Sequence, residues 1–195
     1  MTKAVTSPGA TTDGRTTRDG RHWTLRAARP TDGRPLAELF AAVRAEGRWL
    51  LTPSDALSQP SEAFYIAEMI RDSSALALVA EAESGLVGNL LVSVERAAVS
   101  DHVGTLSIAV AEGWRDVGIG TALVRAAQDW ARDRGLLKVA LSVFPDNDRA
   151  IAVYEHCGFV REGLRRRQYR IRGGDFRDEL LMAWFPEERT SEVDR

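Results

Sequence analysis

The sequence lacks several features that would assign a protein at once to a class. Its 195 residues include a single cysteine, Cys157, so no disulfide can form within the chain, and this composition fits a reducing cytoplasm. No apolar run approaches the roughly 18 residues that suggest a membrane span. A net charge of −2 and a pI near 6.0 argue against a protein that coats nucleic acid. We therefore expect a cytoplasmic protein without a membrane or nucleic-acid partner.

The composition fits one globular domain between two tails. Hydrophobic residues make up 44% of the chain and charged residues 28%, which is ordinary for a folded domain of this length. Residues 1–21 are rich in Thr, Gly and Arg and carry almost no large apolar side chains, so we expect a disordered N-terminal tail there. Residues 187–195 resemble them and are expected to form a flexible C-terminal tail. The domain is then 22–186.

Hydrophobic periodicity predicts a mixture of helices and strands. Apolar residues recur at helical spacing after Thr31, in 62–71, in 119–130 and in 150–157, with Gly135 and Gly158 placed as helix stops. Strands are expected at 22–28, in two runs of 75–95 joined at Glu83-Ser84-Gly85, and at 102–110, 137–144, 159–171 and 178–185. The predicted fold class is α+β, a mixed sheet of about seven strands flanked by helices.

The segment EGWRDVGIGTAL at 112–123 places a glycine cluster between a strand and a helix. Amides at a helix start lack intrahelical partners and can bind an anion, although such glycines can also serve the turn alone. A dinucleotide fingerprint requires a third glycine near Leu123, and a phosphate-binding P-loop requires a lysine between Gly120 and Thr121. Both nucleotide motifs are therefore rejected, while the structural turn and the anion site stay open.

Two motifs together resemble a known family. Residues 115–120 have the form Arg/Gln-x-x-Gly-x-Gly/Ala, and NDRAIAVYEHCGFVREG at 147–163 follows about thirty residues later. The second matches Asn-x-x-Ala-x-x-x-Tyr-x-x-x-Gly-Phe at Asn147, Ala150, Tyr154, Gly158 and Phe159. In this order they resemble the GNAT superfamily, the Gcn5-related N-acetyltransferases, over residues 23 to 186. The resemblance implies an acyl-CoA N-acyltransferase fold with a mostly antiparallel, twisted sheet, and direct acetyl transfer from acetyl-CoA to an amine.

The resemblance also implies the residues that hold acetyl-CoA. The strand that ends at Val110 would splay from its neighbour, so that backbone groups of Ile108, Ala109 and Val110 contact the pantetheine arm. Amides of the following turn would bind the pyrophosphate, with Arg115 beside it. These are Asp116, Val117, Gly118, Ile119, Gly120 and Thr121. Asn147 would contact the cofactor arm, cap its helix, or do both.

The expected chemistry needs an acid and a base. Tyr154 would hydrogen-bond or protonate the departing thiolate, which makes it a cofactor-binding residue as well as the candidate acid, although its spacing also fits a plain core residue. Family members often carry a glutamate base on the strand before the glycine turn, and counting back from the turn places Gly104 there. His102, two residues earlier, is the candidate base, with a structural strand-edge histidine as the alternative. Glu46 and Glu95 are reserves, and Glu46 is also the candidate acceptor-binding residue.

The acceptor is expected to be the primary amine of a small molecule. A protein N-terminus or lysine is the alternative within enzymes, and a non-catalytic acyl-CoA sensor is the alternative outside them, given weight by the missing glutamate. No metal is expected, because His22 and His156 have no partners at metal spacing. Cys157 is predicted to be a small buried hydrophobe, and the arginines at 165–167 a solvated strand end. The resemblance also implies a homodimer, because many members of the family pair.

Overall fold

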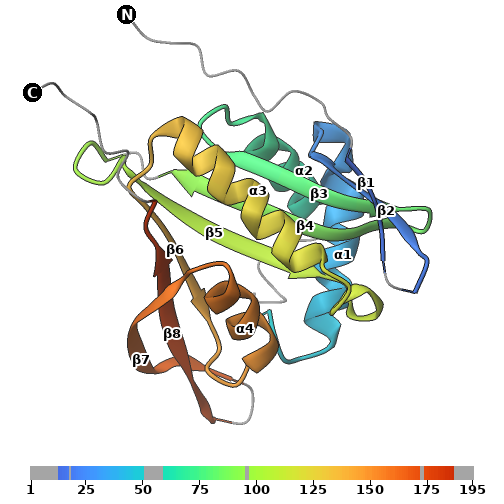
Figure 1. Ribbon diagram of the computed structural model, residues 1–195. Helices are drawn as coiled ribbons and strands as arrows, with labels where there is room; N and C mark the ends of the chain where they lie inside the picture. The colour runs from blue at the N-terminus through green and yellow to red at the C-terminus, as the bar shows by residue number, and fades with distance from the viewer. Residues whose placement is uncertain (1–12, 18, 51–58, 95–96, 172–173, 187–195) are drawn as a thin grey trace, which may run out of the picture.

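A computed structural model describes residues 13–17, 19–50, 59–94, 97–171 and 174–186 (Figure 1). The strands are β1 (Asp13–Thr16), β2 (His22–Ala27), β3 (Leu76–Ala82), β4 (Gly85–Val94), β5 (Val103–Val110), β6 (Lys138–Val143), β7 (Val160–Arg170) and β8 (Phe176–Trp184). The helices are α1 (Gly33–Ala45), α2 (Gln59–Arg71), α3 (Ile119–Arg134) and α4 (Asp148–His156). None of the helices in these ranges is long and apolar enough to cross a membrane.

The strands form one mixed sheet in the order β1-β2-β3-β4-β5-β6-β8-β7. Neighbours are antiparallel except β5 and β6, which are parallel, so the predicted α+β fold with a mostly antiparallel sheet is confirmed. The sheet has eight strands among the described residues, one more than expected. The periodicity located the other seven, as well as all four helices.

The additional strand is β1, which lies inside the predicted disordered tail 1–21. Its residues pair with β2, from Asp13 opposite Leu25 to Thr16 opposite His22. The tail prediction is therefore wrong at residues 13–16. An edge strand is held by backbone hydrogen bonds and can be short and polar, so the sequence DGRT carries no hydrophobic alternation to reveal it. The intervening turn is closed by Thr17, whose hydroxyl accepts from the Arg21 amide at 2.9 Å.

Helices cover both faces of the sheet and bury two apolar clusters. Residues of α3 and α4 share a cluster with Leu78 and Ala80 of β3, whereas residues of α1 and α2 share the other with Val79. Because side chains alternate along a strand, these neighbours on β3 must face opposite sides. Figure 1 shows α3 across the face of β3, β4 and β5, with α1 behind the sheet. The sheet is thus a middle layer with one face toward α3 and α4 and the other toward α1 and α2.

A buried ion network fixes the start of α1 against the sheet. Arg26 of β2 donates two hydrogen bonds to the Asp32 carboxylate, at 2.7 and 3.0 Å, and a third to Glu81 of β3 at 2.7 Å. Asp32 also accepts from the Arg29 amide at 2.7 Å. Arg26 and Asp32 have side chains only 9% and 10% exposed. Removing one partner would leave the other buried and poorly compensated.

We therefore expect Asp32→Ala to lower the free energy of unfolding by about 3 kcal/mol. For a chain of this size that corresponds to a Tm lower by roughly 6–12 °C, measured by thermal denaturation. Glu38→Ala is the matched control, because its ion pair with Arg34 is exposed and should contribute less than about 1 kcal/mol. Equal stability losses in the two variants would contradict the importance of the buried network.

The same carboxylate gives a pH dependence with a defined sign. Burial raises the pKa of Asp32, but its hydrogen bonds with Arg26 and the Arg29 amide outweigh burial, and the net shift is downward. A lowered folded-state pKa stabilises the fold above the ordinary carboxyl pKa and loses that effect as pH falls below it. Acidification should therefore cost Asp32→Ala less stability than the parent chain, which denaturant titrations at neutral and acidic pH would measure. Parallel losses would contradict this assignment.

Candidate functional site

The sheet opens between β5 and β6. These strands pair only from Val103 opposite Lys138 to Thr105 opposite Ala140. Beyond that point β5 stays paired with β4, and β6 stays paired with β8, so the two halves of the sheet diverge. A cleft of about 1190 Å³ lies along the opening, bordered by the glycine turn, the start of α4 and the segment that follows α1. The predicted splay of the strand before the glycine turn is thus present.

The glycine turn delivers an uncapped helix start to one end of this cleft. Gly118 takes φ +93°, a left-handed conformation that favours glycine, and Asp116 is also left-handed at φ 64°. Helix α3 begins at Ile119, and the Ala122 amide donates to the Gly118 carbonyl at 3.0 Å. Amides of the preceding helical residues have no carbonyl one turn earlier, and no described side chain caps them. The turn therefore presents an anion site with the positive end of the helix dipole.

Most of the residues predicted to hold acetyl-CoA line this cleft. They are Ile108, Ala109, Val110, Arg115, Asp116, Val117, Gly118, Gly120, Thr121, Asn147 and Tyr154. Ile119 differs, because its side chain is only 1% exposed and packs in the core below α3. Its methyl group lies near Gly88, where an added Cβ would come within 3.1 Å. Only the Ile119 amide can serve the anion site, and the small residue at 88 lets α3 approach the sheet.

Helix α4 brings a phenol to the cleft. Asn147 caps the helix, with its Oδ1 accepting from the Ala150 amide at 3.3 Å, so the predicted cap role is confirmed. Tyr154 is 6% exposed and its ring lies 5.8 Å from that of Phe159. Its hydroxyl bonds to no described residue, yet no fully buried side-chain oxygen in the described part lacks a partner. The hydroxyl must therefore open into the cleft, and burial of the ring raises the Tyr154 pKa above its usual 10.

Arg115, predicted beside the pyrophosphate, and Glu46, the candidate acceptor-binding residue, bond to each other. The Arg115 guanidinium donates to both Glu46 oxygens, at 2.8 and 2.6 Å, and its Nε donates to the Val110 carbonyl at 2.9 Å. Both side chains are largely buried, at 12% and 18% exposure. The ion pair makes Glu46 less available to an acceptor amine, whereas Arg115 still lines the cleft beside the glycine turn; both predicted roles stay predictions. The pair ties the end of α1 to the glycine turn.

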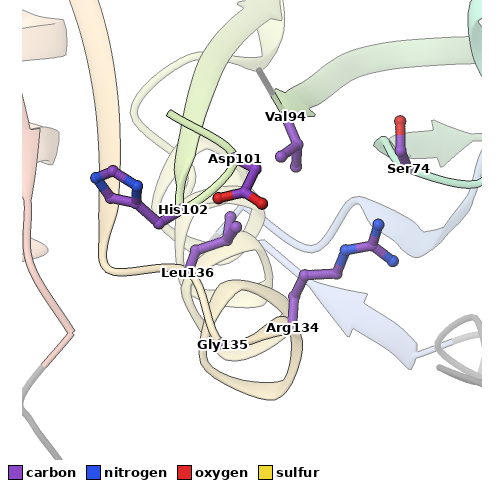
Figure 2. A pocket seen from close by; sticks show the side chains of 7 residues that line it. All are labelled: Ser74, Val94, Asp101, His102, Arg134, Gly135 and Leu136. Atoms are coloured by element: carbon purple, nitrogen blue, oxygen red, sulfur yellow. The ribbon is translucent and has the colours of Figure 1, made fainter. Parts of the chain in front are cut away.

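The base predicted on the strand before the turn is not in the cleft. His102 precedes β5 and lines a separate depression of about 470 Å³ beside the end of α3. Figure 2 shows its imidazole directed away from the Asp101 and Arg134 side chains. Thr105, the first β5 residue that lines the cleft, is three positions after His102, which is roughly 10 Å along a strand. His102 is therefore removed as the candidate base.

Gly104, the position counted for the family's glutamate, does not face the cleft. A Cβ on Gly104 would lie 2.8 Å from the Val92 Cγ1 and 3.0 Å from the Leu136 Cδ1, so residue 104 faces the core. Alternation along β5 instead turns Thr105 and Ser107 outward, and both line the cleft. Neither can act as a carboxylate base, so the absence of a glutamate on this strand stands. Glu95, the other reserve, lies outside the described residues.

Sequence reasoning missed a carboxylate on the cleft floor. Glu179 of β8 is 4% exposed, and its oxygens accept from the Tyr169 hydroxyl at 2.6 Å and from Arg165 at 3.1 Å. Ser142 of β6 also hydrogen-bonds to it. Burial raises the Glu179 pKa, but these donors outweigh it and the net shift is downward. The strand predicted at 178–185 begins with two acids before an unbroken apolar run, so its sequence alone indicated neither the burial of Glu179 nor its partners on β6 and β7.

The remaining candidates behave as structural residues. Cys157 is 9% exposed, burial raises the pKa of its thiol, and its carbonyl accepts from Gln128 at 2.7 Å, so the prediction of a small buried residue is confirmed. The arginines at 165–167 lie on the exposed strand β7, as expected. Within the described ranges, no three His, Cys, Asp or Glu side chains gather as a metal site.

Comparison with known proteins finds acetyltransferases that resemble this chain. A family model described as Acetyltransferase (GNAT) family matches residues 43–159, more than half of the chain. An L-amino acid N-acetyltransferase, AaaT of Escherichia coli, is 34% identical over 54% of this chain and 65% of its own length. The N-alpha-acetyltransferase RimI of Mycobacterium tuberculosis is 46% identical over 35% of this chain and 42% of its own. The matched segments thus span less than two thirds of these curated relatives.

Solved structures agree over more of the chain. A GNAT-family acetyltransferase from Streptococcus pneumoniae superposes with a TM-score of 0.76 at 24% identity, covering 84% of this chain and 99% of its own. Mycobacterium smegmatis RimJ, solved in complex with CoA-disulfide, gives a TM-score of 0.70 at 25% identity, covering 92% and 88%. Together with the splayed strands, the glycine turn and the tyrosine helix, these matches show that the chain belongs to the GNAT acetyltransferase family and has its acyl-CoA N-acyltransferase fold.

Proposed function

We propose that this protein is an acetyl-CoA-dependent N-acetyltransferase that acetylates the primary amine of a small molecule. The observation that carries the proposal is the single cleft that joins the uncapped start of α3 to the Tyr154 hydroxyl through the opening between β5 and β6. A pyrophosphate, a pantetheine arm and a thiol leaving group need these three features in this order. The solved RimJ complex with CoA-disulfide, from a relative 25% identical, supports the same ligand class.

The residues present fit acetyl-CoA. The amides of Ile119, Gly120 and Thr121 would hold its pyrophosphate. From Leu106 to Val110, the β5 edge turned away from β4 has no strand partner, and its backbone groups are available to the amide-rich pantetheine arm. Acetyl-CoA supplies an activated acetyl thioester to this site. A β5 amide at the thioester oxygen would contribute the oxyanion stabilisation that such donors provide, roughly 3 kcal/mol.

Tyr154 is the proposed general acid. Because burial raises its pKa above the usual 10, the phenol stays protonated at neutral pH and keeps a proton at its Oη for the leaving sulfur. Asn147 lies in the same cleft and fixes the start of the helix that carries Tyr154. The acid is therefore held on a rigid, capped helix.

A protein N-terminus is the second candidate acceptor. It is favoured by the 46% identity to an N-alpha-acetyltransferase and by a second relative, an Escherichia coli ribosomal protein bS18-alanine N-acetyltransferase, 34% identical over 44% of this chain. The similarity to an L-amino acid N-acetyltransferase supports the small-molecule acceptor. The non-catalytic sensor stays an alternative, because no glutamate on β5 faces the cleft. The cytoplasmic location and the homodimer stay predictions.

Thiol release from acetyl-CoA, followed with a panel of amines, tests the proposal. We expect turnover above the hydrolysis background with amino acids or other small primary amines. Peptides with a free N-terminus, and the same peptides N-terminally blocked but carrying lysine, distinguish the protein acceptors. Faster turnover of free peptides than of every small amine would replace the first candidate by the second. Acetyl-CoA binding without turnover on any acceptor would support the sensor instead.

A further inference from the structure

Glu179 reaches the cleft from the face opposite Tyr154. Leu180 and Met182, two residues apart on β8, point to the same face of the sheet and belong to the core below α3 and α4. Alternation along β8 turns Glu179 to the other face, toward the segment after α1. Arg177, two residues before it, confirms this direction, because its Nη1 donates to the Arg48 carbonyl. The carboxylate and the phenol therefore approach one cleft from its two sides.

The partners of Glu179 leave it charged and incompletely satisfied. Tyr169, Ser142 and Arg165 each donate to it, and an ionised carboxylate accepts about four hydrogen bonds. The hydrogen bond to Glu179 raises the Tyr169 pKa to about 12, so this phenol remains a donor. Arg165 is a weak counter-ion, since its side chain is 56% exposed and makes one contact at 3.1 Å. A buried anion with room for another donor thus lines the cleft on the face toward the segment after α1.

The other acids along the cleft are less suited to bind a cation there. Glu46 is held by two hydrogen bonds from Arg115, whereas Asp116 and Asp146 are exposed, with side chains 65% and 62% accessible. The remaining two, Glu112 and Asp148, are exposed residues in the short helical turn before α3 and at the start of α4. Glu179 is buried like Glu46, but among the described residues it receives only one hydrogen bond from an arginine.

We propose that Glu179 binds the acceptor amine as an ammonium ion, so that the cleft selects cationic alkylamines over neutral arylamines. The inference rests on the proposed acetyltransferase function and adds the group that chooses the substrate class. Phe144 and Tyr169, whose rings lie edge to face at 5.9 Å, form an aromatic wall beside the carboxylate. The preferred acceptor then carries an apolar or aromatic body next to its ammonium group.

Glu179→Gln tests the proposal, since glutamine keeps the size and one acceptor oxygen, which can still accept from the Tyr169 hydroxyl, while losing the charge. Equilibrium binding of phenethylamine and of its neutral isostere phenethyl alcohol is measured by titration calorimetry or ligand-observed NMR. We expect phenethylamine to bind the parent chain more tightly than the alcohol, and the variant to lose about 10- to 50-fold in amine affinity. Binding of the alcohol and of CoA should stay within about twofold.

Two comparisons keep the result interpretable. Glu162→Gln on β7 is the matched control, because Glu162 pairs with Lys138 outside the cleft, and it should leave every affinity unchanged. In thiol-release assays, Glu179→Gln should raise KM for alkylamines more than for an arylamine such as aniline. Equal losses for amine and alcohol, or none, would overturn the ammonium site. A parent chain that binds phenethylamine but acetylates nothing would instead refute the proposed function and leave the binding inference standing.

Discussion

Replacing Tyr154 by phenylalanine should lower kcat by about three orders of magnitude while leaving the fold and acetyl-CoA binding intact. A positioned general acid typically contributes 10²- to 10⁴-fold. The substitution removes only the hydroxyl, which makes no hydrogen bond to a described residue, and keeps the ring that packs against Phe159. The glycine turn, which would hold the cofactor, lies on another helix and is untouched. The expected signature is therefore a loss in kcat with KM for acetyl-CoA unchanged.

The pH profile adds a second readout. Burial raises the Tyr154 pKa above its usual 10, so the phenol should remain protonated across a neutral to mildly alkaline assay range. The parent chain should accordingly show no loss of kcat from ionisation of this phenol below about pH 10. Steady-state kinetics at several pH values measure both effects. Tyr65→Phe is the control, because Tyr65 is 57% exposed on α2 and should not change the rate. A Tyr154→Phe enzyme with full kcat would reduce Tyr154 to a core residue.

Local sequence signals predicted the elements well because each element carries its own periodicity. The predicted stripe on α3 reappears as buried Ile119, Ala122 and Leu123. The helix ends at Gly135, which adopts the left-handed conformation of a helix stop at φ 77°. Strand β1 escaped because an edge strand can be stabilised by backbone pairing without apolar side chains. Periodicity reports burial, so an element that buries little gives little signal.

The candidate site likewise has a part that local sequence signals predicted and a part that they did not. The backbone cradle could be predicted because it depends on a short contiguous motif, and the turn at Gly118 has the geometry that motif implies. The side-chain partners could not, because they join distant segments. Glu46 and Arg115 are 69 residues apart, and no spacing in the sequence pairs them. Glu179 and Ser142 meet because β6 and β8 are neighbours in the sheet although they are not consecutive strands.

The pyrophosphate assignment for the glycine turn predicts opposite effects of Gly120→Asp on folding and on ligand binding. A Cβ at this second residue of α3 meets nothing closer than Val153 Cγ1, at 3.8 Å, so the side chain has room. An acid in the first turn of a helix is favourable by about 0.3–1 kcal/mol. The variant should therefore be at least as stable as the parent chain, while its affinity for CoA should fall by at least about 100-fold.

The expected loss of CoA affinity comes from the charge of the new side chain rather than its shape, and Gly120→Asn distinguishes the two causes. A carboxylate about 4 Å from a phosphate charge costs roughly 4 kcal/mol at an effective dielectric constant of 20, and an amide of the same size carries no such charge. Saturating CoA should raise the Tm of the parent chain and of Gly120→Asn, but hardly that of Gly120→Asp. Equal losses in both variants would indicate steric blockage. Unimpaired binding by Gly120→Asp would mean that the glycines serve the turn alone, because a phosphate held by these amides cannot tolerate a fixed negative charge beside it.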